Sequence, residues 1–221
     1  MEVELLCLAN SQKLGGRCLA GLRTDGQGWI RPVTNTPSGT LSIRQASIAG
    51  AEIALLDVVR ADLASARPEP HQPENHILAS TPLIFVENLA PTEALPLLSA
   101  AIERGPDLLR GATDRIARQS FDARPTQHSL SLIEPAILRW VVTTSLRGNP
   151  QVRGVFSLSG TTYDLVVTDL VWKARFGGRD VGTYPPDATG TNRSNRVLLV
   201  ISLSEPLNGM CYKLIAGVIV I

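Results

Sequence analysis

The chain has 221 residues, of which 44% are hydrophobic and 19% are charged, and its formal net charge is +1. This composition is typical of a globular protein and excludes a disordered or fibrous class. The small net charge excludes a protein that coats nucleic acid through a broad basic surface, so any phosphate site has to be local.

The N-terminal segment has the pattern of a three-stranded meander. An apolar run over 3–9 has strand length, and further β-compatible runs cover 18–24 and 29–33. The turn sequence 25–28 carries two glycines and predicts a hairpin between the second and third runs. We expect residues 10–17 to form a polar, glycine-containing loop.

The next segment completes a first β-rich half. Residues 34–50 are mixed and loop-like, and 52–63 fits a strand better than a helix because of its β-branched residues. The proline-rich stretch 67–76 predicts an extended loop. Residues 77–89 would then supply a closing strand.

Helix-forming residues begin at Pro91, and apolar positions at helical spacing predict a helix that ends near Gly105. We expect a second short helical piece over 107–117 and a polar connector over 118–128. The β pattern then returns, with predicted strands at 129–133, 137–144, 152–158, 163–167, 196–203 and 210–221. A short helix over 171–176 interrupts it, and a loop that we expect to be mobile covers 177–195.

These patterns predict a mainly β fold with a small helical insert, built as two OB-like β-barrels packed as one unit. The predicted division is an N-terminal barrel over 1–90, a helical insert and connector over 91–128, and a C-terminal barrel over 129–221. The pattern by itself does not separate the OB fold from other small barrels.

Targeting and redox signals favour a cytoplasmic protein. The acidic N-terminus is unlike a secretory signal, and the apolar run 214–221 is too short to span a membrane. The three cysteines, Cys7, Cys18 and Cys211, lie in apolar runs and are expected to be buried, reduced thiols. We expect no membrane partner.

Several motifs spread over the chain carry a resemblance to a known family. They are Cys7-Leu-Ala-Asn-Ser-Gln-Lys-Leu-Gly-Gly-Arg-Cys-Leu-Ala-Gly21, Gly28-Trp-Ile-Arg-Pro-Val33, Gln72-Pro-Glu-Asn-His76, Tyr163-Asp-Leu-Val-Val-Thr-Asp169 with Trp172, and Tyr212-Lys-Leu214. With these motifs the chain resembles the bacterial family of dual OB-containing domain proteins. The resemblance implies two OB-like barrels in one polypeptide and no defined reaction. Gln12 stands where we expect a basic residue.

The predicted loop 10–17 is the first candidate ligand site. It combines small polar groups, two glycines and two cations, in Asn10, Ser11, Lys13, Gly15, Gly16 and Arg17. Exposed amides beside two cations can hold a phosphate or another anion. The same residues also fit a polar hairpin loop that the glycines stabilise.

Trp29 and Arg31 lie two residues apart in a predicted strand and therefore share one face. An exposed tryptophan beside an arginine would form a base-stacking platform with a phosphate contact, as OB folds use for single strands. A core position for Trp29 is the alternative. The chain is only 5% aromatic, which favours a short oligonucleotide or a nucleotide over a long channel.

The cluster His71, Glu74, Asn75 and His76 is the densest group of side chains that titrate or bind metal near neutral pH. Its position in a proline-broken loop, without helical spacing, favours hydrogen bonds that fix the loop. We predict no metal site and no metal or redox cofactor.

The sequence contains no catalytic signature that we recognise, so catalytic residues stay undefined and an enzyme is the less favoured class. At the junction after 163–167, Asp169 fits a helix cap and Trp172 a core position. The leading hypothesis is a protein that binds a short single strand, a strand end or a nucleotide signal. Its ligand-binding residues would be Asn10, Ser11, Lys13, Arg17, Trp29, Arg31, Asn75 and His76. The alternatives are a nucleotide-directed hydrolase or transferase that uses His71, Glu74 or His76, and a module that binds a protein partner.

Overall fold

The computed structural model describes residues 1–105, 107–145, 148–189 and 195–221. The described chain divides into two compact units. The first unit comprises Met1–Ala101 and Gln119–Ser129, and the second comprises Ile102–Arg118 and Leu130–Ile221. Strands predominate in both units, which confirms the mainly β class. The residues of the predicted insert are divided between the two units, and the three-part division of the chain stays a prediction.

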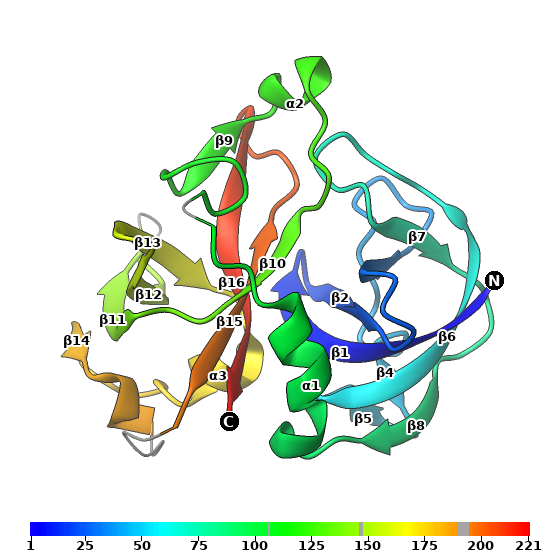
Figure 1. Cartoon of the computed structure of the whole chain (residues 1–221), viewed down its shortest axis with the longest axis horizontal. Helices are drawn as coiled ribbons and strands as arrows, with labels where there is room; N and C mark the ends of the chain where they lie inside the picture. Colours follow the sequence, from blue (N-terminus) through cyan, green and yellow to red (C-terminus); the bar gives the residue numbers. More distant parts are fainter. Residues whose placement is uncertain (106, 146–147, 190–194) are drawn as a thin grey trace. The chain divides into compact units, whose positions relative to one another are not determined.

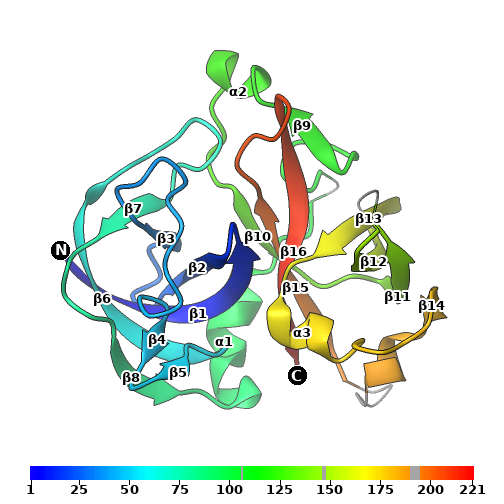
Figure 2. The same ribbon diagram turned by 180° about the vertical axis from the view of Figure 1, so that it is seen from behind.

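The first unit is built on a closed barrel of five strands (Figures 1 and 2). The strands are β1 (Glu2–Lys13), β2 (Gly16–Arg23), β3 (Trp29–Val33), β6 (Asp57–Ala66) and β7 (Asn75–Leu78). Their order is β1-β2-β3-β7-β6, and β1 also pairs with β6, which closes the ring. Only the β3–β7 ladder is parallel. The predicted meander and OB-like barrel are confirmed.

The first unit also contains short strands and helices outside the five barrel strands. They are β4 (Ser47–Ile48), β5 (Ala51–Glu52), β8 (Ile84–Asn88), α1 (Pro91–Ala101) and α2 (Ser120–Ala123). The strand expected from residue 52 begins only at Asp57, because residues 53–56 form an irregular link that includes Leu56 at φ 71°. The single closing strand expected over 77–89 is two strands, β7 and β8, and both pair with β6.

The β1–β2 hairpin corrects the predicted loop. Residues 10–13 continue β1, and β2 begins at Gly16, so the turn contains only Leu14 and Gly15. Both turn residues have positive φ, 45° and 81°, as a type I′ turn requires. A Cβ at Gly16 would lie 2.2 Å from the Leu41 carbonyl oxygen, so the strand approaches residue 41 closer than a side chain allows.

The barrel core explains which face each strand residue occupies. Leu5, Cys7, Leu19 and Ile30 belong to one buried apolar cluster inside the barrel. A register shift between Cys7 and Ala9 then reverses the faces of β1, and Asn10 pairs with Leu19. Asn10 therefore lies on the core side, where its Nδ2 donates to the Ile53 carbonyl oxygen at 2.7 Å.

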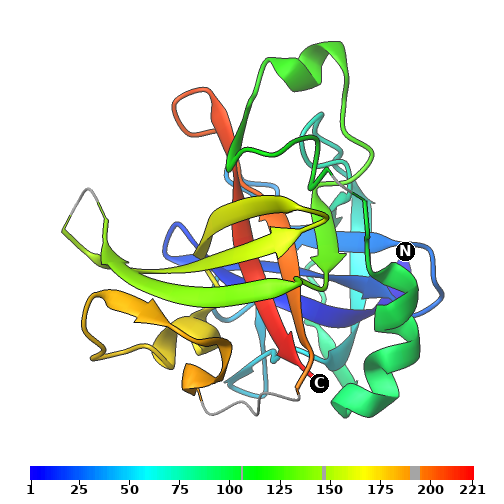
Figure 3. The same cartoon turned by 60° about the vertical axis from the view of Figure 1, so that its left-hand side comes forward.

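The second unit is an eight-stranded sheet with short helices (Figure 3). Its elements are β9 (Arg115–Ala117), β10 (Leu130–Ile133), β11 (Ile137–Thr144), β12 (Pro150–Leu158), β13 (Thr161–Val167), α3 (Leu170–Ala174), β14 (Gly182–Tyr184), the 3-10 helix η1 (Pro186–Thr189), β15 (Val197–Leu203) and β16 (Met210–Val220). The order is β10-β15-β16-β13-β12-β11-β14, and β9 pairs with β16.

This sheet contains the strand order of the first unit. A meander β11-β12-β13 is followed by a parallel step to β16 and then by β15, as β1-β2-β3 is followed by β7 and β6. Among the described residues β11 and β15 do not pair. Instead β14 lies beside β11 and β10 beside β15.

Two expectations for the second unit are corrected. The helical piece expected over 107–117 consists of turns and the strand β9, because Ile116 pairs with Cys211 of β16. The loop expected over 177–195 contains β14 and η1, and its residues 190–194 lie outside the described residues.

The cysteines carry no disulfide: Cys7 and Cys211 are buried and Cys18 is half-buried. Burial raises the pKa of the Cys211 thiol to about 11, which keeps it protonated at neutral pH. No helix in the described part of the chain has the length and apolar character needed to cross a membrane.

Candidate nucleic-acid interface

The β1–β2 hairpin places Asn10 and Arg17 on its core-side face and Ser11 and Lys13 on its outer face. The register shift sets which face Asn10 occupies, and successive strand residues then alternate between the two faces. The Arg17 guanidinium is bound by Glu52 at 2.5 and 2.7 Å, and its hydrogen bonds lower the pKa of that carboxyl. Ser11 is buried, and Lys13 is half-buried at the end of the hairpin. The cations predicted to share one loop therefore have different surroundings.

Trp29 and Arg31 lie on the outer face of β3, since Ile30 between them belongs to the barrel core. Trp29 is half-buried, but Arg31 is only 1% exposed. Arg31 Nη2 donates to Glu74 Oε1 at 3.0 Å and to Ser129 Oγ at 2.8 Å. The arginine that the sequence assigned to a phosphate is therefore held inside the protein by a carboxylate.

The motif Gln72-Pro-Glu-Asn-His76 forms a buried polar network with Arg31. The second Glu74 oxygen accepts from the Ser129 main-chain N–H at 3.3 Å, and Ser129 Oγ also donates to Glu74. Asn75 Nδ2 donates to Gln72 Oε1 at 3.2 Å, and Asn75 Oδ1 is buried with no hydrogen-bond partner in the described part of the chain. Such a network fixes the β6–β7 loop against β3.

The histidines of this loop have separate surroundings. His71 is buried and its ring lies 6.4 Å from that of Phe121. His76 Nδ1 lies 3.0 Å from the Glu74 main-chain oxygen, which can only accept, so Nδ1 is the donor of this hydrogen bond. The described residues contain no group of ligands arranged for a metal ion.

The predicted residues of the first unit do not form one continuous surface. Lys13 and Trp29 flank opposite ends of β2, about 20 Å apart at the usual rise per strand residue. Ala20 and Leu22, on the outer face between them, are 1% and 5% exposed. Lys13 and Trp29 would therefore contact a ligand as two separate points.

In the second unit, the predicted cap and core positions at α3 are confirmed. Asp169 Oδ1 accepts from the Trp172 N–H at 2.9 Å, which satisfies the first turn of the helix. Oδ2 accepts from the Val218 N–H at 2.9 Å, and Trp172 is 2% exposed. Burial raises the pKa of the Asp169 carboxyl, and its main-chain hydrogen bonds oppose that shift.

Around α3 the structure assembles a group of which the sequence identified only a part, with Trp172 expected in the core. We call it the arginine–aromatic cluster and define it as Trp140, Trp172, Phe176, Tyr184, Arg175 and Arg179. The Arg175 Cζ lies 4.8 Å from the Trp172 ring centre. The Arg179 Cζ lies 5.6 Å from Phe176 and 5.2 Å from Tyr184. The four-residue spacing of the arginines was a signal in the sequence, but Trp140 and Tyr184 come from distant strands.

Polar groups of the second unit also surround Lys213 of β16. Its side chain is 1% exposed, and Nζ donates to the Gly111 carbonyl oxygen at 2.5 Å. The Nζ also lies 5.6 Å from the ring centre of Tyr163. Burial lowers the pKa of Lys213 to about 8, and the charges of Asp107 and Asp114 oppose that shift.

Three solved structures align with this chain at low similarity. The tetrameric p202 HIN2 has 9% identity and a TM-score of 0.29, with 100% of this chain and 92% of that chain covered. A murine DNA-binding protein bound to double-stranded DNA has 9% identity and a TM-score of 0.33, covering 100% and 97%. The p204 HINb domain has 11% identity and a TM-score of 0.32, covering 99% and 95%.

No curated protein matches the chain. A family model described as the dual OB-containing domain matches residues 3–218, nearly the whole length of the sequence. This match agrees with the closed barrel of the first unit and with the repeated strand order of the second. The chain therefore belongs to the dual OB-containing domain family.

Proposed function

We propose that this protein binds a short single strand of nucleic acid. The observation that carries the proposal is the position of the predicted residues in the first OB barrel. OB folds hold oligonucleotides on their second and third strands and on the loops that join the first two and the last two strands. Arg17, Trp29 and Arg31 lie on β2 and β3, while Lys13, Asn75 and His76 flank those two loops.

These residues have different parts in the proposal. Trp29 is half-buried on the outer face of β3 and offers a ring for base stacking, and Lys13 offers a charge to a phosphate. When the ring is neutral, His76 Nε2 can accept a hydrogen bond from a base or a sugar. Arg17 and Arg31 are bound by carboxylates, so their part is to hold the scaffold rather than to contact phosphates.

The first test is fluorescence anisotropy of labelled single-stranded DNA and RNA of about 12 nucleotides, with mononucleotides as competitors. We expect binding, and Trp29→Ala should weaken it about 5- to 160-fold, because one stacked base contributes about 1–3 kcal/mol. Trp29→Phe keeps a ring and should retain most of the affinity.

Lys13→Ala and Arg44→Ala form a matched pair for the electrostatic part, since both remove one cation from the first unit. We expect Lys13→Ala to weaken binding and Arg44→Ala to leave it unchanged. Absence of binding to strands and nucleotides at low salt would overturn the proposed function. Normal binding by Trp29→Ala would overturn the stacking assignment alone.

A second candidate function, association with a protein partner, is favoured by one feature of the first unit. The strand β8 pairs only with β6 among the described strands, and its Ile84, Phe85 and Val86 are 49%, 48% and 37% exposed. An edge strand with exposed apolar side chains can add a strand from another chain. This function predicts that the protein forms a complex with another chain and that Phe85→Lys abolishes the complex, as measured by its molar mass in light scattering. The substitution is on the surface, so it should change the free energy of unfolding by no more than about 0.5 kcal/mol.

A further inference from the structure

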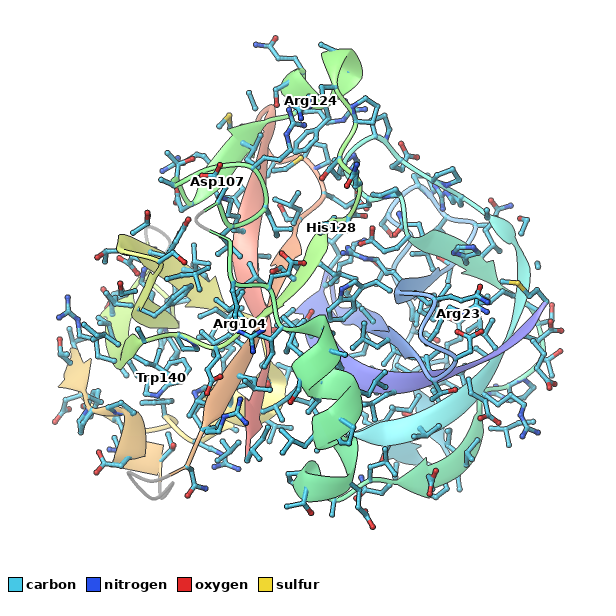
Figure 4. The ribbon with its side chains drawn as sticks, viewed as in Figure 1. Arg23, Arg104, Asp107, Arg124, His128 and Trp140 are labelled. Carbon is cyan, nitrogen blue, oxygen red and sulfur yellow. The ribbon has the colours of Figure 1, made fainter. Side chains whose placement is uncertain are left out.

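The aromatic rings of the arginine–aromatic cluster in the second unit contact one another in a continuous series. The ring centres of Trp172 and Trp140 are 5.0 Å apart, those of Trp140 and Phe176 are 6.0 Å apart, and those of Phe176 and Tyr184 are 6.0 Å apart. Trp140, labelled in Figure 4, lies on β11, where that strand pairs with β14. The series runs from two fully buried indoles to the half-buried ring of Tyr184.

Arg175 and Arg179 lie over these rings, and both are exposed. Their side chains donate to main-chain carbonyl oxygens: Arg175 Nη1 to Thr189 at 3.5 Å and Arg179 Nη2 to Ala188 at 2.5 Å. Within the described ranges, no carboxylate forms an ion pair with either guanidinium. Carbonyl groups and ring faces orient a guanidinium but do not neutralise it, so two positive charges are held at the surface.

Several other arginines of the protein are bound by carboxylates, although Arg67 also donates to main-chain carbonyl oxygens, those of Thr34 and Thr36, at 2.7 Å. Arg17, Arg31, Arg153 and Arg196 each have a carboxylate within 3.0 Å. The guanidinium pair at α3 is oriented by aromatic rings instead, which leaves donors for an incoming anion. An oriented guanidinium loses less conformational freedom on binding a phosphate than a free side chain does.

The buried indoles give a second, independent observation. Nε1 of Trp140 and Nε1 of Trp172 are both buried and have no hydrogen-bond partner among the residues that the structure describes. A buried donor without an acceptor is destabilising, and tryptophan N–H groups in proteins are usually paired. Both donors lie within the arginine–aromatic cluster, and no described residue uses them.

We infer that the arginine–aromatic cluster is a second nucleic-acid contact, in which Arg175 and Arg179 bind the phosphodiester backbone and Tyr184 stacks against a base. Planar guanidinium groups match phosphate oxygens in geometry as well as in charge. The ring of Tyr184 is the one aromatic face of the cluster that is half-exposed. This inference rests on the proposed function, but its site lies in the other unit and can fail separately.

The three tryptophans make the two sites distinguishable in one experiment. Trp29 belongs to the first unit, and Trp140 and Trp172 belong to the cluster, so the protein has only three indole N–H signals in a ¹⁵N NMR spectrum. Trp29→Phe identifies the first-unit signal without altering the cluster. We would titrate the full chain with single-stranded oligothymidylate of about 12 nucleotides and, separately, with inorganic phosphate.

The expected result is that the strand moves the signals of Trp140 or Trp172, and that Arg175→Gln with Arg179→Gln abolishes this shift. The double variant should also reduce the salt slope of binding by about 1.4, because two phosphates are no longer neutralised. Arg44→Gln with Arg139→Gln is the matched control, since it removes two exposed arginines outside the cluster. Arg175→Lys with Arg179→Lys should keep the slope and lose affinity, because lysine does not bind phosphate bidentately.

If the strand moves only the Trp29 signal, the inference is overturned and the proposed function stands. If no indole signal moves and anisotropy shows no binding, both fail. An equal shift with inorganic phosphate alone, at the same concentration of phosphate groups, would overturn the assignment to a strand. Unchanged cluster shifts in the Arg175 and Arg179 double variant would overturn the role of these arginines.

Discussion

At the scale of single residues, burial separates two arginine–carboxylate pairs that are alike in the sequence. The Arg31 and Glu74 side chains are 1% and 5% exposed, whereas those of Arg17 and Glu52 are 11% and 41% exposed. Removal of one partner from a fully buried pair leaves a charge without compensation, whereas solvent reaches and screens a pair in which one partner, here Glu52, is exposed.

We therefore predict that Glu74→Ala lowers the free energy of unfolding by about 3–5 kcal/mol. The matched change Glu52→Ala should lower it by less than about 1 kcal/mol. Urea denaturation followed by tryptophan fluorescence measures both. Equal losses for the two variants would contradict the structural role that we assign to Glu74.

Lys213 gives a prediction about pH at the same scale. Its pKa is lowered from 10.5 to about 8 in the folded protein, so below about pH 8 the folded and unfolded chains both hold the proton. Between the two values the unfolded chain binds more protons, and stability should rise with pH. Lys213→Met should lack this rise.

The measurement is the free energy of unfolding of both proteins at about pH 7, 8 and 9. The Cys211 thiol, whose pKa is raised from 9.0 to about 11, acts in the opposite direction from about pH 9 upward, but wild type and Lys213→Met share this thiol, so their difference reports Lys213 alone. Parallel pH profiles for wild type and Lys213→Met would show that Lys213 is not the responsible group.

At the scale of elements, α3 depends on one side chain for its position. Asp169 caps the helix at the Trp172 N–H and binds the Val218 N–H of β16, so it connects the helix to the sheet. Asp169→Ala should cost about 1–3 kcal/mol, since it leaves a buried donor without an acceptor. Asp169→Asn keeps one acceptor and should cost less.

The functional readout of the same prediction is strand binding. Trp172 and Arg175 follow the cap directly, so displacement of α3 should weaken the cluster's contact and leave the contact at Trp29 unaffected. The indole N–H signals of the three tryptophans report both contacts. If the urea unfolding transition of Asp169→Ala has the same midpoint as that of the wild type, the Asp169 side chain does not hold α3 in position.

The sequence predicted a strand or helix correctly where the propensities of neighbouring residues are sufficient to specify it. The runs at 29–33 and 137–144 have the bounds of β3 and β11, and the helix from Pro91 is α1. The strand β9 was not predictable, because helix-compatible residues 107–117 pair with β16 only when the sheet has formed. Pairing with a distant strand overrides local propensity.

At the scale of the whole molecule, the net charge is only +1, and the number of cations that contact phosphates sets how strand binding responds to salt. The two contacts involve Lys13, Arg175 and Arg179, so log Kobs should fall against log salt with a slope of about −2. Anisotropy titrations between about 50 mM and about 200 mM salt measure this slope. A slope steeper than about −5 would indicate a broad phosphate surface and contradict the assignment to a few residues.

The sequence by itself determined the β class, the OB family, the cap at Asp169 and the residues grouped around the first barrel, because alternation, turn residues and caps depend on near neighbours. Only the tertiary structure decided which of those residues are available to a ligand. The register shift between Cys7 and Ala9 moves Asn10 to the core side, and Arg31 meets Glu74 across 43 residues of sequence. The arginine–aromatic cluster likewise needs β14 beside β11 before Tyr184 joins Phe176 and Arg179. Such partners are set by long-range strand pairing and burial, which a local pattern does not contain.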